Sequence, residues 1–248
     1  SIQKLINRPL HYNYYFPARE RSDLAELIIN LTPDSLDKIF FLSTGSEANE
    51  VAIKMARTWQ IKKNVNKNKV ISFVSGYHGR TMGSQLAGGT KSAKDWISEN
   101  DEFFVQVPFP DGYREKNTEF KLFLETLTEK NINSCEIALV LMESYQGGGA
   151  SFAPKKYVKE LREWCSRNNI LLCMDEVQSG FGRTGKLFAY EHYEIFPDLI
   201  TCGKGISGSL PLSAVIGPSY LLDQFSPGSM SSTHGGHILS CCAAKANI

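Results

Sequence analysis

The sequence predicts an α/β fold of three layers, α/β/α, in which helices cover both faces of a mostly parallel sheet. Seven short apolar runs, rich in β-branched and aromatic residues, have the length and composition of buried strands. They are KIFFL (38–42), KVISFV (69–74), FFVQV (103–107), IALVLM (137–142), ILLCM (170–174), DLITC (198–202) and SAVIG (213–217). Helical patterns separate several of them, and no internal repeat or low-complexity linker divides the chain.

Two of the segments between these runs carry the apolar face of an amphipathic helix. In residues 48–59 the apolar side chains recur at intervals of three or four residues, which is the spacing of one helix face. A second pattern starts at Pro154, a residue suited to the first turn of a helix. Its apolar side comprises Tyr157, Val158, Leu161, Trp164 and Cys165. Strands that are apolar throughout and alternate with such helices indicate a sheet that is buried on both faces.

The composition is that of an ordinary globular protein and excludes several classes of function. Of 248 residues, 42% are hydrophobic and 21% charged, and 27 basic side chains stand against 26 acidic ones. Neither disorder nor a nucleic-acid partner is therefore indicated. The longest basic stretch, residues 62–69, alternates with Asn and lacks aromatic residues, and we interpret it as a solvated loop. Because no apolar run is long enough for a membrane helix and the first residues lack a secretory signal, we expect no membrane partner and a cytoplasmic location.

Neither the cysteines nor the histidines have the spacing of a metal site. The six cysteines form no C-x-x-C pair, and we expect them to be free and mostly buried thiols. The motif HGGH at residues 234–237 has no neighbouring cysteine or carboxylate, which metal sites usually add to histidine. No metal is predicted.

The polar residues that follow the predicted strands are the candidates for a binding site, because ligands of parallel sheets bind at the carboxyl ends of the strands. The first strand is followed by STGSEANE, in which Thr44 can form a capping box with Glu47. Gly45 and Ser46 then lie at the positive end of the helix dipole. Such a helix start binds phosphate, although many capped helix starts bind only water.

The second strand is followed by SGYHGRTMG, a glycine-rich loop that is expected to expose Tyr77 and His78. An aromatic side chain at this edge can stack on a planar ring, or it can fold back onto the core. Arg80 offers a rigid pair of donors that suits a carboxylate. This loop therefore supplies a candidate stacking residue and a candidate anion contact.

Asp175 and Glu176 place two carboxylates directly after the buried strand at residues 170–174. An apolar run that ends in Asp-Glu resembles the magnesium-binding strand of P-loop ATPases, but the chain has no G-x-x-x-x-G-K-[ST] motif. A carboxylate at a strand end can instead keep a pyridinium nitrogen protonated. That use requires a lysine nearby.

Lys204 follows the next strand and lies between Gly203 and Gly205, 29 residues after Asp175. Most lysines are only solvated charges, but a lysine at a strand end can form a Schiff base with an aldehyde once it loses its proton, and partial burial favours that loss. Together the four strand ends offer a phosphate cradle, a stacking aromatic, a partner for a ring nitrogen and an amine. Pyridoxal 5′-phosphate requires all four.

The chain resembles a known family in the motifs STGSEANEVAIKMAR, GYHGRTMG, ESYQGGG, DEVQSGFGRTGKLFAYEHYEIFPDLITCGKGISGSLPLSAVIG and STHGGHILSCCAA. In this order they are similar to the class III aminotransferases of the ω-amino acid, acetylornithine, ornithine and 4-aminobutyrate type. These are pyridoxal-phosphate enzymes of fold type I. The motifs cover most of the chain, and their combination is far more specific than any one of them.

The resemblance implies roles for the residues at the strand ends. Lys204 would hold the cofactor as a Schiff base and move a proton of the substrate, Asp175 would pair with the ring nitrogen, and Gln178 would bond the ring hydroxyl. Further cofactor-binding residues that it implies are Thr44, Gly45 and Ser46 at the phosphate, Tyr77 and Val177 on the two ring faces, His78, Glu143 near the ring, and Thr233 at the phosphate of the neighbouring subunit. Thr233 thus implies a homodimer with shared active sites, and Arg80 implies a contact with a substrate carboxylate or amide.

Two departures from the family pattern bear on substrate and domain organisation. Where the family often has E-P-x-Q-G-E-G-G, this chain reads ESYQGGGA, so Gly148 replaces the second glutamate. This favours members of the amine:pyruvate kind or other members that lack this glutamate. Members of the family are longer, so we expect residues 1–35 to be a partial N-terminal segment with a helix that leads into the domain. Residues 36–248 would be the large, cofactor-binding domain, and the small C-terminal domain would be absent from this chain.

The resemblance implies a transaminase that moves an amino group from an amine or (ω-)amino acid to a keto acid. Alternatives are a non-catalytic or incomplete cofactor-binding fragment, which the missing second domain favours, and a related aminomutase or decarboxylase. Gln178 favours the transaminase over the aminomutase. An ATP-dependent switch at residues 171–176 would require nucleotide binding and has little support.

Overall fold

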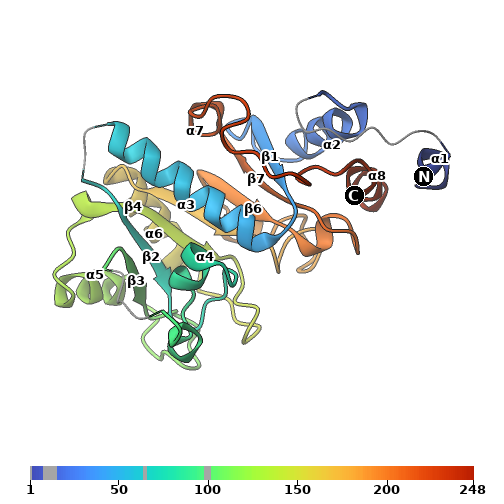
Figure 1. Ribbon diagram of the computed structural model, residues 1–248. Helices are drawn as coiled ribbons and strands as arrows, with labels where there is room; N and C mark the ends of the chain where they lie inside the picture. Colours follow the sequence, from blue (N-terminus) through green and yellow to red (C-terminus); the bar gives the residue numbers. More distant parts are fainter. Residues whose placement is uncertain (1, 8–15, 64–65, 98–101) are drawn as a thin grey trace.

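The computed structural model describes residues 2–7, 16–63, 66–97 and 102–248 and contains one sheet of seven strands. The strands are β1 (Lys38–Leu42), β2 (Lys69–Phe73), β3 (Phe104–Val107), β4 (Ile137–Glu143), β5 (Leu171–Asp175), β6 (Leu199–Cys202) and β7 (Ser213–Gly217). Each end lies within one residue of the sequence prediction. The order across the sheet is β1-β7-β6-β5-β4-β2-β3 (Figure 1). Only β7 runs antiparallel to its neighbours β1 and β6, so the prediction of a mostly parallel sheet is confirmed.

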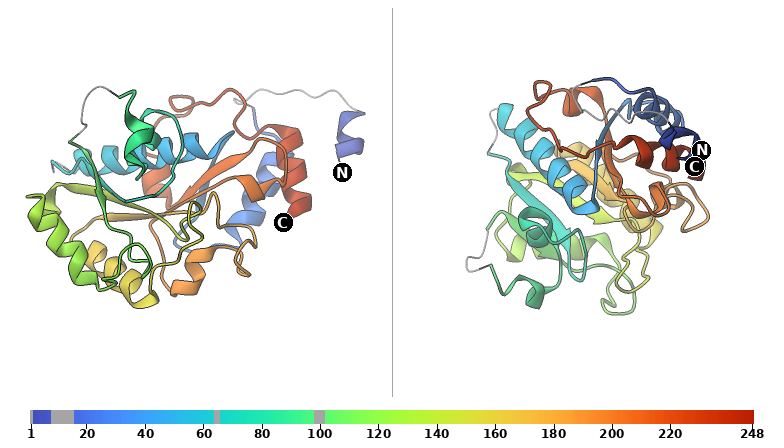
Figure 2. Two further views of the ribbon diagram at one scale, coloured as in Figure 1. Left: turned by 90° about the horizontal axis from the view of Figure 1, so that it is seen from below. Right: turned by 45° about the vertical axis from the view of Figure 1, so that its right-hand side comes forward.

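Helices cover both faces of this sheet, as predicted. The helices in the described part of the chain are α1 (Ile2–Ile6), α2 (Arg19–Ile29), α3 (Gly45–Lys62), α4 (Met82–Ala87), α5 (Phe120–Glu129), α6 (Lys155–Arg167), α7 (Ser219–Leu222) and α8 (Ile238–Asn247), with short 3-10 helices η1 (Lys91–Lys94), η2 (Ser134–Glu136), η3 (Ala189–Tyr193) and η4 (Lys204–Ile206). In the left view of Figure 2, α3 lies on one side of the sheet and α5 and α6 on the other. The apolar side chains accordingly form two cores, one with α3 and one with α2, α5, α6 and α8.

The pairing of the central strands places their carboxyl ends side by side. Glu143, the last residue of β4, pairs with Asp175, the last residue of β5, and Asp175 pairs with Thr201 of β6. All seven residues of β4 and all five of β5 are buried. Because hydrophobic burial fixes these strands, the polar side chains at their ends are held on a rigid edge of the sheet.

The prediction of free and mostly buried cysteines is confirmed. The six cysteines are free, and four of them are buried, although Cys135 is exposed. In the described part of the chain no helix is long and apolar enough to cross a membrane. Nor do the described residues include a group of three His, Cys, Asp or Glu side chains that could hold a metal ion. The boundary between residues 35 and 36 stays a prediction.

The interpretation of residues 62–69 as a solvated loop is wrong at Lys67. Residues 64–65 lie outside the described part, but Lys67 is only 6% exposed. Its Nζ donates to the backbone oxygens of Asn168 (2.5 Å) and Asn169 (3.0 Å), at the end of α6. These carbonyls have no partner within the helix, so the lysine serves as a C-terminal cap. Burial lowers the pKa of Lys67.

We expect the substitution Lys67→Met to lower the free energy of unfolding by about 1–3 kcal/mol, because it keeps the stem but removes both hydrogen bonds to the carbonyls at the end of α6. Asn169 O keeps a bond from Gln60 Nε2 (2.9 Å), which limits the loss. Denaturant unfolding monitored by circular dichroism measures the difference. The control is Lys156→Met on the exposed side of α6, for which a change within about 0.5 kcal/mol is expected. Equal stability of the two variants would contradict the capping role.

Candidate active site

The carboxyl ends of the strands surround a cavity of about 400 Å³, which we call the strand-end cavity. It is lined by Gly45, Ser46, Asn49, Ser75, Tyr77, His78, Gly79, Thr90, Glu143, Gly147, Gly148, Asp175, Val177, Gln178 and Lys204. Nine of the residues predicted for the site are among them. They come from five separate segments of the sequence, and the sheet brings them together.

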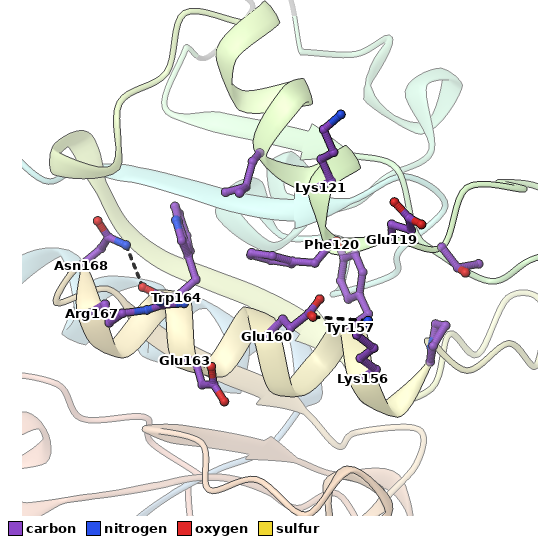
Figure 3. A pocket seen from close by; sticks show the side chains of 13 residues that line it. Glu119, Phe120, Lys121, Lys156, Tyr157, Glu160, Glu163, Trp164, Arg167 and Asn168 are labelled. Atoms are coloured by element: carbon purple, nitrogen blue, oxygen red, sulfur yellow. Dashed lines mark hydrogen bonds and ion pairs between the residues drawn. The ribbon is translucent and has the colours of Figure 1, made fainter.

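A wider groove of about 930 Å³ lies elsewhere, between α5 and α6 on the outer face of the protein (Figure 3). Its floor is the edge of a core, since Phe120 packs edge-on against Tyr157 and Trp164 with ring centroids 5.5 and 6.4 Å away. Its rim mixes three acidic and three basic side chains: Glu119, Glu160, Glu163, Lys121, Lys156 and Arg167. The groove contains none of the strand-end residues, so we assign the candidate site to the smaller cavity on the grounds of its chemistry.

The start of α3 forms one wall of the strand-end cavity and is built to receive an anion. The predicted capping box is present: Glu47 N donates to Thr44 Oγ1 (3.3 Å), and Thr44 N donates to Glu47 Oε2 (2.8 Å). A Cβ at Gly45 would stand 2.7 Å from Val177 Cγ1, so only glycine fits there. The backbone N–H groups at Gly45 and Ser46 therefore lie at the open, positive end of an 18-residue helix.

Asp175 is held by a buried network of hydrogen bonds, and the sequence analysis did not predict the part played by Asn49 and Thr201. His78 Nδ1 donates to Asp175 Oδ2 (2.7 Å), and Asn49 Nδ2 donates to the same oxygen (2.8 Å). Asn49 Nδ2 also lies 2.7 Å from His78 O, and Thr201 Oγ1 donates to Asn49 Oδ1 (2.8 Å). Val177 N donates to Asp175 Oδ1 (3.0 Å). The carboxylate thus accepts three hydrogen bonds, and Thr201 in turn holds the side chain of Asn49.

The expectation that His78 is exposed is wrong. The residue is only 3% exposed, and its ring forms a hydrogen bond with the carboxylate of Asp175. Burial favours the neutral imidazole. The hydrogen bond to Asp175 and the charges of Asp175 and Glu143 outweigh burial and raise the pKa of His78. His78 therefore holds the carboxylate of Asp175 through a buried hydrogen bond at the wall of the strand-end cavity.

Glu143 closes the cavity beside this pair. Its carboxylate accepts from Tyr77 N (3.0 Å) and Gly147 N (3.2 Å). Burial raises the pKa of Glu143, and the charge of Asp175 adds to this, while the charge of His78 opposes it. By binding Tyr77 N and Gly147 N, Glu143 ties together the two loops that follow β2 and β4.

Lys204 reaches the cavity from the first position of η4, with a backbone φ of 39°. A lysine in this left-handed region is strained, and such strain is found where function constrains a residue. Its Nζ donates to Gln178 Oε1 in a short hydrogen bond. The residue is exposed rather than partly buried as expected, because the cavity itself is open to solvent on that side.

Three predicted site residues do not line the strand-end cavity. Thr44 contributes its side chain to the helix cap. Arg80 is exposed, with its guanidinium 5.7 Å from the centre of the Tyr77 ring, and its backbone N donates to Ser46 Oγ (3.2 Å). Thr233 lines a separate cavity of about 670 Å³. Their roles stay predictions.

Asn49 and Thr201 are the residues that sequence reasoning overlooked. Asn49 stands beside Ala48 and Ala52 on the buried side of α3, and a buried amide in an apolar helix face is a signal for a hydrogen-bonding partner. Thr201 lies within a buried strand. Neither partner is close in sequence, so only the structure connects them to Asp175.

Solved structures that superpose on this chain include transaminases. A transaminase from Virgibacillus superposes with a TM-score of 0.90 at 28% identity, over 99% of this chain and 57% of that one. The taurine:2-oxoglutarate aminotransferase of Bifidobacterium kashiwanohense, solved with PLP and glutamate, has a TM-score of 0.88 at 28% identity, over 99% and 57%. The likeness extends over nearly the whole of this chain.

The family model for class-III aminotransferases matches residues 1–248. The chain belongs to the class-III aminotransferases. Curated relatives include the acetylornithine aminotransferases of Nitrosomonas europaea, 36% identical over all of this chain and 60% of the relative, and of Methanopyrus kandleri, 33% identical over all of this chain and 59% of the relative. The chain thus spans about 60% of the length of these curated relatives.

Proposed function

We propose that this chain is the cofactor-binding part of a pyridoxal 5′-phosphate-dependent transaminase. The observation that carries the proposal is that Lys204 and Asp175 line one cavity with the amino-terminal end of α3. When bound, the cofactor supplies an electron sink that stabilises negative charge on the substrate carbon. Membership of the class-III aminotransferases and the likeness to transaminase structures support the proposal.

The residues of the strand-end cavity fit this cofactor. A phosphate dianion matches the backbone N–H groups at Gly45 and Ser46, next to the Thr44 cap. A ring nitrogen that must stay protonated matches the carboxylate of Asp175. An aldehyde matches the Lys204 amine, and Gln178 beside it suits a ring hydroxyl. Tyr77 and Val177 line the same cavity and would flank the ring, with His78 and Glu143 behind it.

In the proposed reaction the side chains divide the work. Asp175, oriented by His78 and Asn49, holds a proton on the ring nitrogen and so keeps the ring electron-poor. Lys204 would hold the cofactor through its amine and, once free, would accept a proton from the substrate carbon and donate it to a carbon of the cofactor. Glu143 holds the Tyr77 loop against one face of the cavity. The amino donor would be an amine or amino acid and the acceptor a keto acid.

We further propose that the protein is a homodimer with shared active sites. Thr233 lies outside the strand-end cavity of its own subunit, which leaves its hydroxyl free to serve a neighbouring site. A substrate carboxylate would bind Arg80 at the rim. Residues 36–248 are proposed as the large domain, and the chain's share of its relatives' length supports a further domain in the whole protein. A cytoplasmic location stays a prediction.

The proposal is tested by mixing the purified chain with pyridoxal 5′-phosphate, reducing with borohydride and mapping the labelled peptide. We expect an absorbance band of the bound cofactor and a label on Lys204, because among the described lysines it is the one that combines a strained strand-end position with the cavity. Lys204→Met should lose the label. The matched control Lys186→Met, at an exposed lysine, should keep it.

A label spread over exposed lysines, or none, would contradict the proposal for this chain. Label on Lys204 without any turnover of an amine with pyruvate would favour the alternative, an incomplete cofactor-binding fragment. The chain spans only about 60% of the length of its relatives, so label without turnover has to be distinguished from a failure to label Lys204.

A further inference from the structure

Asn49 and Thr201 form a buried pair of polar side chains beside Asp175. Asn49 is 1% exposed and Thr201 is fully buried, and burial of an amide or a hydroxyl is costly unless it is hydrogen-bonded. Asn49 lines the strand-end cavity, whereas Thr201 belongs to β6 and is not among the lining residues. Thr201 pairs with Asp175 in the register of β5 and β6. The pair therefore approaches the same carboxylate from two elements, α3 and β6.

The hydrogen bonds of Asn49 give its amide one orientation. Its Nδ2 donates to the backbone oxygen of His78 (2.7 Å) and to Asp175 Oδ2 (2.8 Å), so both of its N–H groups have acceptors. Its Oδ1 accepts from Thr201 Oγ1 (2.8 Å). A rotated amide would set its oxygen against two other acceptors. The hydroxyl of Thr201, as the donor to Oδ1, favours the same orientation.

These bonds fill one oxygen of the Asp175 carboxylate and leave room at the other. Oδ2 accepts from His78 Nδ1 (2.7 Å) as well as from Asn49, which uses its two lone pairs. In the described part of the chain Oδ1 accepts only from Val177 N (3.0 Å). Since Asp175 lines the strand-end cavity, Oδ1 is the oxygen with an acceptor position left for a donor there.

Asn49 also joins three segments of the candidate site. On α3 it lies one turn after Gly45 and Ser46, the proposed phosphate cradle. Its amide binds the loop after β2 through the backbone of His78, and it binds the end of β5 through Asp175. One side chain thus fixes the distance between the start of the helix and the carboxylate, which a cofactor with a phosphate at one end and a ring nitrogen at the other requires.

We propose that Asn49 and Thr201 are positioning residues of the transaminase site. Thr201 fixes the amide of Asn49, Asn49 holds Asp175 Oδ2, and Oδ1 is thereby presented to the ring nitrogen. The inference rests on the proposed function and extends it to a residue outside the cavity. Neither side chain transfers a proton, since both act through Asp175. Without them the carboxylate is free to turn, and the ring nitrogen holds its proton less firmly.

The test follows the proton on the ring nitrogen in a form that cannot turn over. The chain is loaded with pyridoxal 5′-phosphate that is isotope-labelled at the ring nitrogen, and borohydride fixes it to Lys204. Nitrogen NMR then gives the pH at which the ring nitrogen loses its proton. We expect this pH to fall by about one unit in Asn49→Ala, because a lost hydrogen bond to a charged group changes the equilibrium about tenfold.

Thr201→Val should lower the same pH, because it keeps the volume of the side chain but removes the hydroxyl. Thr201→Ser, which keeps the hydroxyl, should restore the value of the unchanged chain. In an Asp175→Asn background, Asn49→Ala should cause no further fall, because its effect passes through that carboxylate.

The matched control is Gln60→Ala, at another buried amide of α3. Gln60 Nε2 donates to Asn169 O (2.9 Å), and the residue is not among those that line the strand-end cavity. This variant loses a buried hydrogen bond on the same helix, but it should leave the pH of the ring nitrogen unchanged.

An unchanged pH in Asn49→Ala would overturn the inference, and an unchanged pH in Thr201→Val would overturn the part assigned to Thr201. An equal fall in the Asp175→Asn background or in Gln60→Ala would overturn it in favour of a purely structural role. If Asn49→Ala does not fold, the comparison of Thr201→Val with Thr201→Ser still decides. Failure to label Lys204 in the unchanged chain would instead overturn the proposed function.

Discussion

The variant Asp175→Asn is expected to keep the Lys204 label but to react with an amine about 100-fold more slowly or worse, because removing one preorganised electrostatic group costs about 10²–10³ in rate. The substitution keeps the shape of the side chain and removes its negative charge. The ring nitrogen would then lack the partner that keeps it protonated. A stopped-flow measurement of the change in cofactor absorbance on mixing with an amine gives the rate directly.

The control for this variant is Asp223→Asn, since Asp223 is an exposed partner of Lys38 at 3.0 Å. Its rate should equal that of the unchanged chain. An unchanged rate in Asp175→Asn would contradict the assignment of Asp175 to the ring nitrogen. Loss of the label as well as the rate would mean that Asp175 acts mainly in shaping the cavity, a role that the three hydrogen bonds to its carboxylate also allow.

The strands and the main helices were predictable because their signal is local. A run such as β4 is apolar at almost every position, and only a strand covered on both faces has that pattern. The strand order was not predictable, because pairing joins segments as distant as β1 and β7. Nothing in the local pattern of residues 213–217 distinguishes the antiparallel β7 from its parallel neighbours.

The site was predictable to the extent that its residues follow strands. Asp175, Lys204 and the start of α3 share one edge of the sheet, as the rule for parallel sheets requires. The burial of His78 and the contribution of Asn49 were not predictable, because each depends on a partner about a hundred residues away.

The two adjacent carboxylates at the end of β5, Asp175 and Glu176, have different roles. While Asp175 lines the cavity, Glu176 is fully buried and accepts four hydrogen bonds. Ser144 Oγ and Tyr190 N (2.8 Å) donate to Oε1, and Ser179 Oγ (2.6 Å) and Ala189 N (2.9 Å) donate to Oε2. Burial raises the pKa of Glu176, and these bonds oppose that rise. The residue joins β4, β5 and η3 beneath the candidate site.

We therefore expect Glu176→Leu to lower the free energy of unfolding by about 3–5 kcal/mol, because two buried backbone N–H groups and two hydroxyls lose their hydrogen-bond acceptor. Glu176→Gln should cost less but still about 1–3 kcal/mol, since its amide turns one acceptor into a donor that faces donors. Chemical denaturation measures both. Glu163→Gln, at an exposed residue of α6, is the matched control and should change stability by no more than about 0.5 kcal/mol. If Glu176→Gln were as stable as this control, the carboxylate would not be holding the three elements together, and the rigidity of the strand edge at Asp175 would have to come from apolar packing alone.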